Sequence, residues 1–113
     1  MKSILVIPAL NPPAHLLEYV DQLIASGAEH LVLVDDGSAS EYKPIFKKLS
    51  EHPQCHILTH TVNQGKGRAL KDAFAYILEQ PQWAGLGVIT ADSDGQHLAA
   101  DIRRMDQKME DLH

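Results

Sequence analysis

Two aspartates separated by one residue, Asp92 and Asp94, are the side chains of this sequence best suited to hold a metal ion. They come directly after an apolar segment with strand character, and Gly95 and Gln96 follow them. Carboxylate and amide oxygens are the ligands that hard divalent cations such as Mg²⁺ and Mn²⁺ prefer. The same Asp-x-Asp-Gly spacing is also typical of an ordinary acidic turn, so this segment alone leaves both interpretations open.

Three more polar segments follow strand-like stretches in the same way. They occupy residues 8–11, 35–38 and 63–68. In an open parallel sheet, ligands bind at the carboxyl ends of the strands, which lie at one edge of the sheet. We therefore expect four loops to converge on one cleft.

Apolar periodicity predicts strands that alternate with helices. Continuous apolar, β-branched runs indicate four buried strands, over residues 4–7, 30–34, 56–59 and 87–91. Apolar residues at helical spacing indicate helices over residues 16–24, 42–49, 70–78 and 98–112. In the third helix this stripe consists of Leu70, Ala73, Phe74, Ile77 and Leu78. The expected fold class is α/β, a single domain of right-handed βαβ units around a parallel sheet.

Composition excludes several classes of function. The chain has 113 residues, one domain's worth, and its net charge of −5 argues against nucleic acid as a partner. A single cysteine, Cys55, excludes an internal disulfide and fits a reducing compartment. A cytoplasmic location is therefore expected, and association of the whole protein with the cytoplasmic face of a membrane stays open. No apolar run approaches the roughly 20 residues of a membrane span, so no membrane segment is expected in this chain.

His52, His56 and His60 recur at intervals of four residues. On a helix this spacing would place three metal ligands on one face. The segment has strand character and Pro53 interrupts it, so we do not expect a metal site at these histidines.

Four blocks of the sequence carry polar and glycine residues after apolar strand-like segments. They are VIPALN at residues 6–11, VDDGS at 34–38, NQGKGRAL at 63–70 and DSDGQH at 92–97. In order and spacing these blocks resemble the N-terminal nucleotide-sugar-binding half of family 2 glycosyltransferases with the GT-A fold. Within the family, the chain is most similar to the polyprenyl-phosphate (dolichyl-phosphate-like) sugar transferases. The resemblance implies a partial GT-A fold over residues 1–113, a Rossmann-like three-layer sandwich with strand order 3-2-1-4.

The resemblance also implies where a nucleoside would bind. Pro8, Ala9 and Asn11 would line the pocket for the base and the ribose. Asp35 and Asp36 would hold the nucleoside, because a carboxylate only accepts hydrogen bonds and therefore suits a buried N–H donor. The implied partner is a nucleoside diphosphate sugar of the UDP or GDP type.

The remaining two blocks would bind the diphosphate and a cation. Gly65 and Gly67 would present backbone N–H groups at a helix start, with Lys66 and Arg68 offsetting the phosphate charge. The last block would contact the nucleotide sugar through Asp92 and Ser93, and would hold Mn²⁺ or Mg²⁺ through Asp92, Asp94 and Gln96. The metal would act as a Lewis acid on the departing nucleoside diphosphate.

The sequence departs from the family pattern in two respects. Pro12 stands where many relatives carry an acidic residue, and the acceptor half has no counterpart before His113. Asp101 and Asp106 come too early to be the family's catalytic base, so the catalytic residue is unknown and is expected beyond residue 113. We expect either a truncated donor half of a transferase or a non-catalytic nucleotide- and metal-binding module.

Two other enzyme classes share parts of this pattern. Haloacid-dehalogenase-type phosphatases use an Asp-x-Asp-Gly segment, but a Thr normally follows the Gly, whereas Gln96 follows it here. Receiver domains carry an acidic pair after their first strand, whereas Asp35 and Asp36 follow the second predicted strand. Neither alternative accounts for the four blocks together.

The fourth predicted strand would leave its outer edge bare in the 3-2-1-4 order. An unpaired strand edge presents N–H and C=O groups to another chain. We therefore expect either a homo-oligomer that pairs two copies along this edge or a loosely ordered edge.

Overall fold

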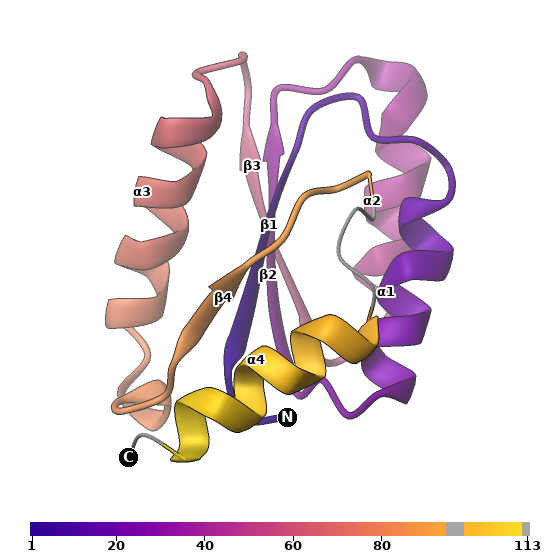
Figure 1. Ribbon diagram of the computed structural model, residues 1–113. Helices are drawn as coiled ribbons and strands as arrows, with labels where there is room; N and C mark the ends of the chain where they lie inside the picture. The colour runs from indigo at the N-terminus through magenta and orange to yellow at the C-terminus, as the bar shows by residue number, and fades with distance from the viewer. Residues whose placement is uncertain (95–98, 112–113) are drawn as a thin grey trace.

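The computed structural model describes residues 1–94 and 99–111 (Figure 1). In chain order the elements are β1 (Ile4–Ala9), α1 (Leu16–Ala25), β2 (His30–Asp36), the 3₁₀ turn η1 (Ser40–Tyr42), α2 (Lys43–Leu49), β3 (Cys55–His60), α3 (Lys66–Leu78), the 3₁₀ turn η2 (Pro81–Trp83), β4 (Val88–Thr90) and α4 (Ala99–Asp111). Every predicted strand and helix has its counterpart, with shifted ends. No described helix is both long enough and apolar enough to cross a membrane.

The four strands form one parallel sheet with the order β3-β2-β1-β4. The predicted α/β class and strand order are therefore confirmed. β4 pairs with β1 through only three residues, Val88 to Thr90, and is an edge strand in the described part of the chain. Pairing of two copies along this edge stays a prediction.

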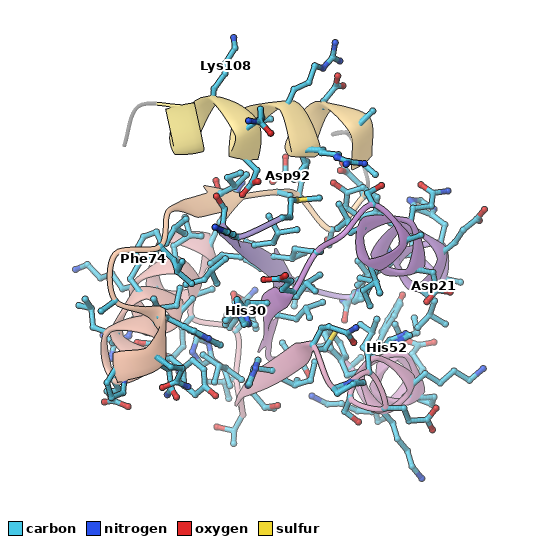
Figure 2. All side chains as sticks on the ribbon, turned by 90° about the horizontal axis from the view of Figure 1, so that it is seen from below. Asp21, His30, His52, Phe74, Asp92 and Lys108 are labelled. Carbon is cyan, nitrogen blue, oxygen red and sulfur yellow. The ribbon has the colours of Figure 1, made fainter. Side chains whose placement is uncertain are left out.

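Side-chain alternation along the strands divides the core into two layers, one on each face of the sheet. Leu5 and Leu33 belong to the layer that α1, α2 and α4 cover, whereas Val6 and Val34 belong to the layer under α3. Figures 1 and 2 show α3 on one side of the sheet, and α1 and α2 on the other. In β1 and β2, odd-numbered residues therefore face α1 and α2, and even-numbered residues face α3.

The predicted core stripe of α3 is partly wrong. Phe74 is 40% exposed and Leu78 is 86% exposed. The buried residues are Ala69, Ala73 and Ile77, which repeat at intervals of four and form the centre of the buried face. Phe74 and Leu78 each follow a buried residue by one position, about 100° around the helix, and this rotation turns them away from the sheet.

The start of β1 fixes α4 to the sheet. The backbone N–H of Ser3 donates to Asp106 Oδ1 at 2.7 Å, and both residues are buried. A charge-assisted hydrogen bond of this kind is among the stronger ones in proteins. Asp106 therefore has a structural role in the described fold.

Candidate functional site

A cleft of about 450 Å³ opens at the carboxyl ends of the four strands. Its described lining consists of Pro8, Ala9, Leu10, Asp36, Asn63, Gly65, Lys66, Asp92, Ser93 and Asp94. These residues come from the end of each strand, from the loop that follows it or, for Lys66, from the start of α3, as expected for an open parallel sheet. The volume is within the range of small-molecule binding sites.

Asp35 and Asp36 are the last two residues of β2 and point to opposite faces of the sheet. On the α2 side, Asp35 is 1% exposed, forms an ion pair with Lys43 and accepts the Ser38 N–H at 2.9 Å. Asp36 lies on the α3 side and lines the cleft. The sequence placed both aspartates in a loop, whereas β2 continues through them, and this continuation separates their roles.

Asp36 is the centre of a hydrogen-bonded cluster on the α3 side of the sheet. Its carboxylate accepts the N–H groups of Gln64 at 2.9 Å and Gly65 at 3.0 Å, and His60 Nδ1 lies 2.8 Å from Asp36 Oδ1. The other ring nitrogen, His60 Nε2, lies 2.7 Å from Asp72 Oδ2 on α3. Asp36 thereby joins the ends of β2 and β3 to the turn that begins α3.

The same contacts shift the pKa values of the cluster. Burial opposes ionisation of Asp36, but the hydrogen bonds from His60, Gln64 and Gly65 outweigh it and lower the pKa of Asp36. The hydrogen bond with Asp36 raises the pKa of His60 against the effect of burial, and the bond with Asp72 adds to this. The hydrogen bond from His60 in turn lowers the pKa of Asp72.

These shifts predict a stability optimum at mildly acidic pH. A raised pKa means that His60 stabilises the fold fully below its ordinary value of 6.5, and the stabilisation is lost as pH rises through the raised value. Lowered values mean that Asp36 and Asp72 stabilise the fold above 3.8, and this is lost as pH falls through their lowered values. Urea unfolding should therefore show that the wild type is less stable at about pH 9 than at about pH 6. In His60→Gln this difference in stability should be smaller. The same pH dependence in both proteins would contradict the assignment.

Lys66, Asp92 and Asp94 bring charges of both signs to the cleft. Lys66 Nζ lies 2.8 Å from Asp92 Oδ1, and both side chains remain partly exposed. Lys66 is the first residue of α3, and the N-terminus of a helix attracts anions. Asp94 is exposed and lines the same cleft. The arrangement suits an anionic ligand that binds together with a cation.

The carboxylates of the cleft fit a divalent cation that is shared with a ligand. Within residues 1–94 and 99–111, no group of three or more His, Cys, Asp and Glu side chains is placed to hold a metal. Mg²⁺ does not need such a cage, because it usually binds one or two carboxylates, substrate phosphates and water. Asp92 and Asp94 place two carboxylates at the cleft that could hold such an ion together with a ligand, whereas Gln96, the third predicted ligand, lies outside the described residues.

Asn11 and Arg68 were predicted as site residues, but like Asp35 and Gly67 they are not among the described lining residues. The N–H of Asn11 donates to Ser38 Oγ, and Asn11 Oδ1 accepts the Ala39 N–H, both at 2.9 Å. Asn11 therefore joins the loops that follow β1 and β2. Arg68 is exposed and pairs with Asp72 along α3 at 3.2 Å.

Four residues of the site and its surroundings were not predicted as site residues from the sequence. Leu10 and Asn63 line the cleft and lie inside the loops that were singled out. His60 and Asp72 have no motif of their own. The usable signal is the strand register, because Asp36 and His60 end neighbouring strands and are register partners.

A parallel three-layer α/β sandwich with a cleft at its strand ends defines the class of this protein, the Rossmann-like domains. Within that class, the family model described as Glycosyl transferase family 2 matches residues 4–113. The chain belongs to glycosyl transferase family 2.

Individual relatives are similar over most of this chain. It is 32% identical over 100 residues to the uncharacterized protein MJ1222 of Methanocaldococcus jannaschii, covering 88% of this chain and 38% of that protein. It is 28% identical over 111 residues to undecaprenyl-phosphate 4-deoxy-4-formamido-L-arabinose transferase of Sodalis glossinidius, covering 92% and 32%. The crystal structure of TarS residues 1–349 of S. aureus matches with a TM-score of 0.63 at 20% identity, covering 98% of this chain and 33% of the crystallised chain, and supports a GT-A-like fold. The chain thus spans about a third of the length of the two relatives and of the crystallised TarS chain.

Proposed function

We propose that the cleft binds the donor of a glycosyl transfer reaction, a nucleoside diphosphate sugar, together with Mn²⁺ or Mg²⁺. The observation that carries this proposal is the meeting of Lys66, the N-terminus of α3 and two carboxylates in one cleft. A chain of net charge −5 repels anions in general. A diphosphate therefore needs local cations, and this cleft supplies one cationic side chain and two carboxylates that would hold a metal.

The position of each carboxylate supports a division of roles. Asp36 is the better candidate for the nucleoside, because it lines the cleft and can accept a hydrogen bond from a base N–H. Asp35 is buried under Lys43 and organises the loop after β2. Pro8 and Ala9 would supply the apolar wall beside the base.

Asp92 and Asp94 would hold the cation, and the diphosphate would complete its coordination. When bound, the metal would supply Lewis-acid stabilisation of the nucleoside diphosphate as it departs. Lys66 would neutralise phosphate charge from the start of α3, close to Asp92. Ser93, between the two aspartates, would contact the donor.

For the acceptor we propose a polyprenyl phosphate. The support is the name of the Sodalis glossinidius relative, which is an undecaprenyl-phosphate sugar transferase. The whole protein would then transfer the sugar from the bound donor to the phosphate of the lipid. A cytoplasmic location stays a prediction.

Calorimetric titration of the chain with UDP and with GDP, each in Mn²⁺ and again in EDTA, tests donor binding directly. We expect saturable binding of one of the two nucleotides, weakened when EDTA removes the metal. The nucleotide that binds identifies the base. A chain that binds neither nucleotide in Mn²⁺ would retain the fold of the family without its donor site.

A further inference from the structure

His60 occupies an unusual position for a histidine, with a carboxylate at each ring nitrogen. Asp36 Oδ1 lies 2.8 Å from Nδ1 and Asp72 Oδ2 lies 2.7 Å from Nε2. The His60 side chain is 10% exposed. Three elements meet at this ring, because Asp36 ends β2, His60 ends β3 and Asp72 belongs to α3.

Both contacts are satisfied only when the ring is protonated. A neutral imidazole has one N–H, so one of the two carboxylates would face a nitrogen lone pair. The imidazolium donates to both carboxylates in charge-assisted hydrogen bonds. The charges agree with this. Arg68 pairs with Asp72, so the cluster holds two carboxylates, one guanidinium and the imidazole of His60. Its net charge is zero only when His60 carries a proton.

The cluster also determines the position of one wall of the cleft. The two N–H groups that Asp36 accepts belong to Gln64 and Gly65, directly before Lys66. Gly65 and Lys66 line the cleft, and Lys66 reaches Asp92. A shift of the Asp36 carboxylate would therefore move the backbone that carries Lys66.

We propose that protonated His60 is a positioning residue of the cleft, which bridges Asp72 to Asp36 and thereby fixes the turn that presents Lys66. Asp72 acts with it as the second anchor, on α3. The role in holding the turn rests on the described contacts alone. Its consequence for donor affinity rests on the function proposed above.

Amide hydrogen exchange of Gln64 and Gly65, followed by NMR as a function of pH, tests the bridge without any ligand. His60→Gln should reduce the protection of both amides by about tenfold or more, the scale of one charge-assisted hydrogen bond. Asp72→Asn keeps His60 but removes one charge that holds its proton. In that variant the loss of protection should occur at lower pH than in the wild type, a shift that a merely space-filling histidine would not produce.

His52→Gln is the matched control. His52 also pairs with an aspartate, Asp21 at 3.1 Å, but the two side chains are 36% and 63% exposed and lie on the α1 and α2 side of the molecule (Figure 2). Its replacement should leave the protection of Gln64 and Gly65 unchanged. Imidazole nitrogen spectra of the wild type should show both nitrogens of His60 protonated at about pH 7.

Three results would overturn the bridge. They are a neutral single tautomer of His60 at about pH 7, unchanged protection in His60→Gln, or an unchanged pH midpoint in Asp72→Asn. If His60→Gln fails to fold, the wild-type spectra and Asp72→Asn still decide. A wild type that binds neither nucleotide overturns the proposed function alone, because the exchange measurements need no ligand.

Discussion

Asp94→Ala is expected to abolish the metal-dependent part of nucleotide binding and to leave the fold intact. Asp94 is exposed at the cleft, so its side chain contributes little to the core. Loss of a residue that only supports a metal ligand lowers metal affinity by roughly 10- to 100-fold. Because Asp94 is proposed as a ligand itself, its loss should lower metal affinity by more than this. Titration with the preferred nucleotide in Mn²⁺ and in EDTA measures the effect: the two conditions should become equal in the variant.

The sign of this effect separates metal binding from general electrostatics. Removing one negative charge from a chain of net charge −5 should by itself favour an anionic ligand slightly. Asp101→Ala removes the same charge from α4, where Asp101 pairs with the exposed Arg104, and should leave affinity equal or slightly higher. Wild-type affinity and EDTA sensitivity in Asp94→Ala would show that this carboxylate does not hold the metal.

Gly37→Ala is expected to be the most destabilising single change in the loops around the cleft. Gly37 has a φ of +77°, and a Cβ there would lie 2.4 Å from both the backbone nitrogen of Asn63 and the carbonyl carbon of Val62. The left-handed backbone costs about 1–2 kcal/mol, and overpacking against another backbone adds about 1–3 kcal/mol. Urea unfolding should therefore show a loss of about 3 kcal/mol or more, a large share of the roughly 5–15 kcal/mol of a small domain.

Gly85→Ala is the matched control, because it introduces the backbone strain without the steric clash. Gly85 has a similar φ of +83°, but a Cβ there meets no atom within 4 Å. Its replacement should cost only about 1–2 kcal/mol. Equal losses in the two variants would show that the loops after β2 and β3 can separate. Because Asn63 lines the cleft, such separation should also weaken nucleotide binding in Gly37→Ala.

Much of the fold could be predicted because the periodicity of apolar residues and the succession of strands and helices can be recognised in the sequence itself. The continuous apolar runs of β1 and β2 indicate strands that are buried on both faces, and alternation with helices requires parallel pairing. The strand order came from the resemblance, and the pairing confirms it. Convergence of the four loops follows from the same topology, because parallel strands end at one edge of the sheet.

The amphipathic stripe of α3 shows where a local pattern is insufficient. Phe74 and Leu78 are apolar and helically spaced, yet they are exposed, because the rotation of α3 on the sheet is decided by small residues such as Ala69 and Ala73. Small side chains let the helix approach the sheet closely. Helical spacing alone does not specify which side of a broad apolar stripe is buried.

The sequence by itself determined the α/β class, the four loops and the candidate carboxylates and cations of the site. Only the tertiary structure decided which of those residues line the cleft and which make structural contacts elsewhere. The length of β2 sends Asp35 to Lys43 and Asp36 to the cleft, and the register of β2 with β3 places His60 beside Asp36. Asp72 joins them from α3, although 35 residues separate it from Asp36 in the sequence. The physical reason is that side-chain direction depends on strand length and register, which long-range pairing determines.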